Sequence, residues 1–179
     1  AAAAIAAADE GAAVLLVDKA PKGHHGGNTR YCMQVMTAVD PAKQGETLAY
    51  YQALRGNKST SSDEILAAWI AESAQNPEWL AAMGANPQPL YDTYPGEYPE
   101  YAPNDAVVPM ALDGVTFDSG MWRFLASQVE QRSDLVDAWH EAPAVKLLRD
   151  PQTGVVLGAT VLLDGAEVNV RARNGVALS

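Results

Sequence analysis

The start of the chain constrains the fold most, because a helix of small residues runs directly into a buried strand. Residues 1–8 are seven alanines and one isoleucine, which have high helix propensity, and Gly11 is a typical residue after a helix end. The next run, residues 13–17, is short and wholly apolar, as in strands that are buried on both faces of a parallel sheet. A helix followed at once by such a strand predicts the second half of a βαβ unit.

An acidic residue and a glycine-rich segment follow that strand. Asp18 stands where a carboxylate in dinucleotide-binding βαβ units accepts hydrogen bonds from ribose hydroxyls. Residues 21–30 contain three glycines, two histidines and an Asn-Thr pair, which favour an irregular loop close to a ligand. The usual partner, a glycine-rich turn before the first helix, is absent, so we expect the chain to begin inside that helix.

The middle of the chain is mainly helical in its pattern. Ser62, followed by two acidic residues, is a typical helix cap, and Asn76-Pro77 predicts a second, short helix that ends at Gly84. Trp79, Leu80 and Met83 are expected to face inward from this second helix. Residues 87–109 are rich in Pro, Tyr and acidic side chains without a period, which predicts an irregular excursion over the surface.

The last third of the chain predicts one helix and four strands. Residues 119–132 are amphipathic, with Trp122, Leu125 and Val129 on one face, and residues 136–139 favour a strand. Residues 144–148, 155–163 and 167–173 predict three more strands, joined by Asp-Pro-Gln-Thr-Gly and Asp-Gly turns. We therefore expect a small β-meander near the C-terminus.

Composition excludes several classes of partner and site. The net charge of -10 argues against binding nucleic acid or an anionic membrane surface. No run of eighteen apolar residues predicts a transmembrane segment. The chain has one cysteine, Cys32, so no intrachain disulfide forms and the compartment, cytoplasmic or periplasmic, stays open. His24 and His25 lack partners at ligand spacing, so we predict no metal site and interpret them as a mobile loop tip.

Several stretches, in order, resemble the fumarate reductase and succinate dehydrogenase flavoprotein family. This family includes soluble fumarate, urocanate and tricarballylate reductases and 3-ketosteroid dehydrogenases. The resemblance rests on residues 1–12, on residues 14–21, on Gly26-Gly27-Asn28-Thr29-Arg30, on Trp79-Leu80 with Met83-Gly84, and on residues 144–158. Residues 171–179 resemble the lead-in to a family segment that the chain does not include, so truncation at both ends is expected.

The resemblance implies which residues contact FAD. Asp18 is expected at the ribose, Gly26-Gly27-Asn28-Thr29 against the pyrophosphate and isoalloxazine, and Ala144 at the adenine through its backbone. Members with covalent FAD carry a His where this chain has Asn28, so noncovalent FAD is expected. The full predicted set of cofactor-binding residues is Asp18, Lys19, Gly26, Gly27, Asn28, Thr29 and Ala144. The family's catalytic residues lie elsewhere, so none is assigned to this chain.

The expected fold is an α/β, Rossmann-like FAD-binding domain with a parallel sheet, surrounding helices and a C-terminal β-meander. It is divided into residues 1–58, the βαβ remainder and flavin loop; residues 59–104, a helical and irregular insertion; and residues 105–179, a helix and the meander. The expected activity is hydride transfer between FAD and a C–C bond of a small organic acid or ketone, with a haem or flavin protein or domain as electron donor. A 3-ketosteroid dehydrogenase is one alternative, and a non-catalytic acidic binding module with a cofactor-free fold is another.

Three further residues or groups have simpler interpretations. Arg30 either offsets phosphate charge or pairs on the surface, and the sequence leaves both open. Cys32 is interpreted as an inert buried thiol, because only Arg30 nearby would lower its pKa. Trp69, Trp79 and Trp122 recur at helical spacing among apolar residues, which indicates packing in the core.

Overall fold

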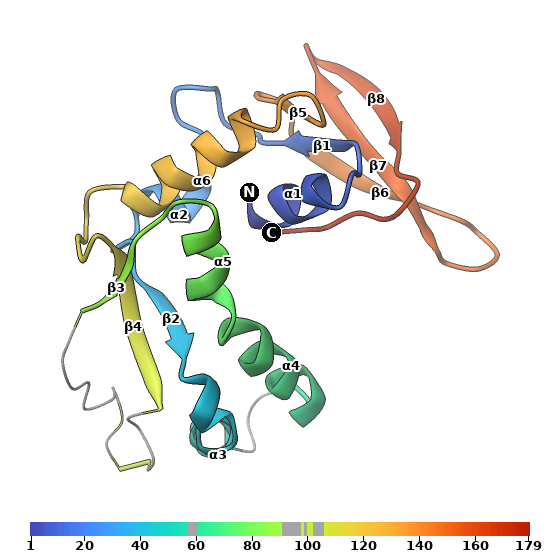
Figure 1. Ribbon diagram of the computed structural model, residues 1–179. Helices are drawn as coiled ribbons and strands as arrows, with labels where there is room; N and C mark the ends of the chain where they lie inside the picture. The colour runs from blue at the N-terminus through green and yellow to red at the C-terminus, as the bar shows by residue number, and fades with distance from the viewer. Residues whose placement is uncertain (57–60, 91–97, 99, 102–105) are drawn as a thin grey trace. The chain divides into compact units, whose positions relative to one another are not determined.

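The computed structural model describes residues 1–56, 61–90, 98, 100–101 and 106–179, and it divides into two compact units. Unit 1 comprises Ala1–Arg30 and Trp122–Ser179, and unit 2 comprises Tyr31–Met121. Figure 1 shows the elements of both units along the chain. The predicted α/β class with parallel strands is confirmed, whereas the division at residues 58 and 104 stays a prediction.

Unit 1 opens with the predicted helix and strand. Helix α1 (Ala2–Asp9) packs against β1 (Val14–Val17), and Gly11 between them has a φ of 81°, as a helix C-terminal glycine often does. Strand β1 pairs in parallel with β5 (Val136–Trp139), the strand predicted at 136–139. β1 is half-buried throughout and not buried on both faces as predicted, because β5 is its one paired neighbour among the described strands.

The predicted β-meander completes unit 1 (Figure 1). Its strands β6 (Ala144–Arg149), β7 (Val156–Leu163) and β8 (Ala166–Arg171) are antiparallel and lie in sequence order. The turn after β6 is held by Asp150, whose Oδ1 accepts hydrogen bonds from the amides of Gln152 and Thr153 at 2.9 and 2.8 Å. The meander predicted from the Asp-Pro-Gln-Thr-Gly and Asp-Gly turns is thus confirmed.

Unit 2 contains a sheet that the sequence pattern did not predict. Strands β2 (Met36–Val39), β4 (Val107–Leu112) and β3 (Pro87–Pro89) are antiparallel, in the order β2-β4-β3. β3 and the start of β4 fall inside residues 87–109, so the prediction of an irregular excursion is wrong at both of its ends. The segment between these strands lies largely outside the described residues. The sequence pattern does not predict β3 because the strand is short and two of its three residues are prolines, which normally disfavour strands.

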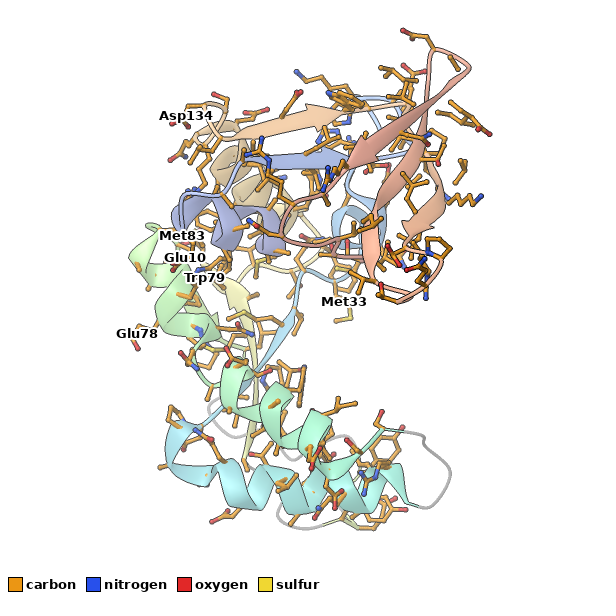
Figure 2. The ribbon with its side chains drawn as sticks, turned by 90° about the vertical axis from the view of Figure 1, so that its right-hand side faces the viewer. Glu10, Met33, Glu78, Trp79, Met83 and Asp134 are labelled. Carbon is orange, nitrogen blue, oxygen red and sulfur yellow. The ribbon has the colours of Figure 1, made fainter. Side chains whose placement is uncertain are left out.

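Unit 2 also contains four helical segments among its described residues. They are η1 (Pro41–Lys43), α3 (Gln44–Arg55), α4 (Asp63–Ser73) and α5 (Asn76–Ala82). The cap predicted for α4 is confirmed, since the Ser62 hydroxyl accepts a hydrogen bond from the Ile65 amide. In α5, Leu80 is buried and Trp79 and Met83 are half-buried, whereas Glu78 projects outward (Figure 2).

Two helices extend over the boundaries between the units. Helix α2 (Gly27–Tyr31) occupies the end of the predicted 21–30 loop, so that loop is helical and not irregular over its last residues. Helix α6 (Gly120–Glu130) is the predicted amphipathic helix and leads through the turn that holds Asp134 (Figure 2) to β5. Both helices bring residues of unit 1 to the carboxyl end of β1.

Candidate functional site

The carboxyl ends of β1 and β5 meet at one edge because the two strands are parallel. Val17 is in register with Trp139, and the Asp18 amide donates a hydrogen bond to the Trp139 carbonyl at 2.9 Å. Beyond the strands the pairing continues, with Ala142 donating to the Asp18 carbonyl and Glu141 to the Ala20 carbonyl, both at 3.0 Å. Ligands of open α/β sheets bind at such edges.

Asp18 organises the segment that follows β1. Its Oδ1 accepts a hydrogen bond from the Ala20 amide at 2.8 Å, and its Oδ2 accepts one from the Gly26 amide at 3.1 Å. Partial burial acts to raise the pKa of this carboxyl. The two amides and the nearby His25 and His140 outweigh burial and lower the pKa of Asp18 below its ordinary value. The side chain is therefore a carboxylate at neutral pH.

Gly26 is required by the close approach of Trp122. Its φ is 108°, a conformation that other residues rarely adopt, and an added Cβ would lie 2.0 Å from Nε1 of the Trp122 indole. Trp122 comes from the first turns of α6. The glycine thus lets a helix far along the chain pack directly on the backbone of the 21–30 segment.

Four side chains form a continuous stack beside this glycine, which we call the ring stack: Arg30, Trp122, His25 and His140. The Arg30 guanidinium carbon lies 4.4 Å from the centroid of the Trp122 ring. The His25 ring meets the Trp122 ring edge-on at 5.4 Å between centroids, and it lies 4.5 Å from the His140 ring. The stack joins α2, α6, the 21–30 segment and the end of β5.

Hydrogen bonds to backbone carbonyls fix the same segment. Nη1 of Arg30 donates to the Gly23 carbonyl at 2.6 Å and to the His25 carbonyl at 3.4 Å. Nδ1 of His25 lies within hydrogen-bond distance of the Lys22 carbonyl, so Nδ1 carries the proton. The two alternatives for Arg30, phosphate charge and surface pairing, stay predictions, and these contacts show that the guanidinium also holds its own loop.

His140 is the least satisfied side chain of the group. Its Nδ1 is buried and has no hydrogen-bond partner, the single buried side-chain nitrogen or oxygen in that condition in the described chain. Burial is the largest cause that lowers its pKa from the ordinary value of 6.5, with His25 and Lys22 acting in the same direction and Asp18 against them. His140 is therefore neutral at pH 7.

The structure brings together some of the predicted cofactor residues. Asp18 and Gly26 are hydrogen-bonded, and Gly27, Asn28 and Thr29 follow directly as the exposed start of α2. Lys19 is exposed next to Asp18. Ala144 is exposed at the first position of β6, two residues after Ala142, which pairs with the Asp18 backbone. That these seven residues bind FAD stays a prediction.

Sequence reasoning missed the ring stack. His25 is half-buried and stacked, so the interpretation of both histidines as a loop tip is wrong for His25, whereas His24 is exposed. Trp122 was assigned to the core, but the indole is half-buried against the loop. The useful signal was the expected strand at 136–139, because a parallel partner of β1 places the residue after it beside Asp18.

Two other predictions fail on burial. Cys32 is exposed and not buried. Trp69 is 41% exposed on α4 and contacts Tyr51 at 5.0 Å between ring centroids, so the prediction that it packs in the core is wrong.

Within the described ranges, no group of three His, Cys, Asp or Glu side chains is placed to hold a metal ion. The described helices are also all too short or too polar to cross a membrane.

The sequence and the structure each match known proteins, and each match covers only part of the known protein. Over 90 residues, 46% of this chain, the sequence is 36% identical to an NADH:fumarate oxidoreductase of Klebsiella pneumoniae (strain 342), of which the match covers 10%. The structure superposes on a 3-ketosteroid-delta4-(5alpha)-dehydrogenase of Rhodococcus jostii RHA1 with a TM-score of 0.71 and 23% identity, covering 97% of this chain and 42% of that one.

A second solved structure has the same fold. A flavocytochrome c3 fumarate reductase in its open conformation matches with a TM-score of 0.71 and 23% identity, over 97% of this chain and 30% of that chain. The chain therefore spans less than half of each of these two solved structures. The model of the FAD binding domain family matches residues 1–179. This protein belongs to the FAD binding domain family, whose cofactor is FAD and whose members include oxidoreductases.

Proposed function

We propose that this chain is the FAD-binding part of an oxidoreductase that transfers hydride between noncovalent FAD and a C–C bond of a small organic acid or ketone. The carrying observation is the Asp18 carboxylate, placed at the shared edge of β1 and β5 and bonded to the Gly26 amide. The 36% identity to an NADH:fumarate oxidoreductase supports an organic acid as substrate.

The residues present fit the cofactor. Each oxygen of the Asp18 carboxylate accepts one amide hydrogen bond, so each keeps a lone pair for a ribose hydroxyl. At Gly27 an added Cβ would meet nothing within 4 Å, and Gly27, Asn28 and Thr29 are all exposed. A dinucleotide binds against exposed backbone of fixed conformation, and here Asp18 and Trp122 contact the start of that backbone at Gly26.

The flavin would supply the redox chemistry, and this chain would bind and orient it. In this proposal Asp18 holds the ribose, Gly26, Gly27, Asn28 and Thr29 lie along the pyrophosphate and the flavin, and Ala144 meets the adenine through its backbone. Lys19, exposed beside Asp18, contributes positive charge near the phosphates. Residues outside this chain would handle the substrate and its proton.

The cofactor is proposed to be noncovalent. Family members that attach FAD carry a His just before the Thr of this loop, and the chain has Asn28 there. A side-chain amide is not a nucleophile at neutral pH, so it forms no bond to the flavin. Asn28 is exposed and offers hydrogen bonds only.

The test is a reconstitution of the full-length protein with FAD, followed by a substrate screen. Reduced protein would be mixed with unsaturated dicarboxylates such as fumarate and, in parallel, oxidised protein with 3-ketosteroids, with flavin absorbance as the readout. Flavin reoxidation by fumarate supports the proposal. Turnover of steroids alone would assign the alternative, a 3-ketosteroid dehydrogenase, and absence of FAD binding would support a non-catalytic binding module.

The electron donor in this proposal is an external haem or flavin protein or domain.

A further inference from the structure

His140 is not among the residues predicted to bind FAD, but its ring contacts the residue that directly precedes Gly26. It follows the last residue of β5, and its ring lies 4.5 Å from the His25 ring between centroids. His25 directly precedes Gly26, the residue that bonds Asp18 and begins the proposed pyrophosphate surface. A change at His140 would therefore reach the cofactor surface through one neighbouring ring.

We propose that His140 is a positioning residue for the cofactor: its ring, packed against the His25 ring, holds residues 26–29 in the shape that faces FAD. The proposal rests on the proposed function, since it assumes that residues 26–29 contact FAD. His140 touches no part of the cofactor in this proposal. It acts through His25, which in turn packs on Trp122.

Hydrogen bonds and ring contacts hold different parts of this segment. Asp18 and the Arg30 guanidinium hold it by hydrogen bonds to Gly26, Gly23 and His25. These bonds leave the His25 ring itself held by the Lys22 carbonyl and by its two ring neighbours, Trp122 and His140. Removal of the His140 ring would leave the His25 ring uncovered on one side.

Protonation should act in the same way as removal. The charged groups that face the two rings are Asp18 at the end of β1, Lys22 in the 21–30 segment and Arg30 in α2. A positive charge on the His140 ring would be repelled by Lys22, and Arg30 adds positive charge at the His25 backbone, against the single carboxylate of Asp18. The stack therefore requires a neutral His140.

The sign of the pH effect follows from the depressed pKa of His140. A histidine whose pKa is lowered in the ordered state binds fewer protons there than when the loop is released. The stack is thus fully stable above the ordinary histidine pKa of 6.5 and weakens as the pH falls below it. Because FAD would bind only the ordered loop, its apparent affinity would fall in the same window.

The experiment compares three variants of the full-length protein. His140→Phe keeps a ring that cannot titrate, His140→Ala removes the ring, and His24→Phe is the matched control at an exposed histidine outside the stack. The FAD dissociation constant is measured by flavin fluorescence from pH 7.5 to pH 5.5. Amide hydrogen exchange of residues 21–30 is measured without FAD.

The expected results separate positioning from mere stability. For the wild type and for His24→Phe, FAD affinity falls on acidification by up to about tenfold for each unit by which the pKa of His140 is lowered. His140→Phe keeps the neutral-pH affinity and loses this acid dependence. His140→Ala binds FAD more weakly at every pH and exchanges its loop amides faster.

Two outcomes overturn the proposal. One is the same acid dependence in His140→Phe as in the wild type, and the other is unchanged loop exchange in His140→Ala. If no variant binds FAD, the proposed function fails, and the exchange rates of the loop amides still decide whether His140 positions the loop. If His140→Ala does not fold, the His140→Phe titration decides alone.

Discussion

Among the described residues, five aspartates directly follow strands, and Asp18 in unit 1 has different surroundings from Asp40 and Asp113 in unit 2. In unit 2, Asp40 follows β2 and caps η1 through the Ala42 amide at 2.9 Å, and Asp113 follows β4 and bonds Asn86 at 3.0 Å. In unit 1, Asp18 follows β1 and lies beside residues 140–142, which come from the far end of the chain. The two sheets explain the difference.

Strand direction decides what meets at a strand end. In the antiparallel pair of β2 and β4, Val39 is opposite Val107 and Met36 is opposite Met110, so the two strands end at opposite edges. In the parallel pair of β1 and β5, both strands end at the same edge. Asp18 therefore lies beside the residues that follow β5, whereas Asp40 bonds the helix that follows its own strand and Asp113 bonds the residue before the neighbouring strand β3.

The largest expected effect is that of Gly26→Ala. The new Cβ would lie 2.0 Å from the Trp122 indole, so the loop must shift, at a cost of about 1–3 kcal/mol, which lowers FAD affinity by about fivefold to 150-fold. Gly23→Ala is the control, because its Cβ would meet nothing within 4 Å. Flavin fluorescence titration measures both. Equal affinities in the two variants would disprove the role of the Gly26–Trp122 contact.

A matched pair of substitutions tests the comparison between the sheets. Asp18→Asn removes the charge that the Ala20 and Gly26 amides stabilise, and we expect about a tenfold loss of FAD affinity. Asp40→Asn should change neither FAD affinity nor stability measurably, because Asn caps helices as well as Asp does. Isothermal titration and urea unfolding provide the two readouts. A loss of FAD affinity in Asp40→Asn would contradict the claim that Asp18, and not Asp40, belongs to the FAD site.

The smallest expected effect concerns one ion pair in each unit. In unit 1, Arg132 contacts both carboxylate oxygens of Asp9, at 2.6 and 3.0 Å, whereas in unit 2 a 2.6 Å contact joins Arg55 to Asp63. The bidentate pair should contribute more to stability, so Asp9→Asn lowers the urea midpoint slightly more than Asp63→Asn does. The reverse order would show that the second contact adds nothing.

The same ion pairs have a defined pH dependence. A hydrogen bond from the arginine is the largest cause that lowers the pKa of each carboxyl below its ordinary value of 3.8. A lowered pKa means that the contribution is complete above pH 3.8 and is lost as the pH falls through the lowered value. The difference between wild type and each variant should therefore vanish in acid, which urea unfolding at a series of pH values measures.

Local patterns in the sequence predicted much of unit 1. Gly11 after an alanine-rich run placed the end of α1, and the Asp-Pro-Gln-Thr-Gly turn placed β6 and β7. Unit 2 was harder, because β3 consists of Pro-Gln-Pro and becomes a strand only through its pairing with β4. The strand propensity of single residues does not report pairing with a strand that is distant in the sequence.

The site was predicted in part for the same reason. Asp18 and the Gly26-Gly27 pair are visible in the sequence because they are local to β1 and its loop. Trp122 and His140 join them only after α6 and β5 have folded back onto β1, and the local patterns that predict α6 and β5 do not show these contacts. His140 in particular has no ligand-like spacing to any other histidine, and its importance arises from a ring contact across the parallel pair.

The most direct test of the proposed function is whether the full-length protein binds FAD, and binds it without a covalent link. The full-length protein would be purified, its visible spectrum recorded, and the protein then precipitated with acid. Flavin absorption that moves entirely into the supernatant is the predicted result. Flavin that stays with the precipitate would contradict noncovalent binding, and a colourless protein that FAD cannot reconstitute would contradict the proposed function itself.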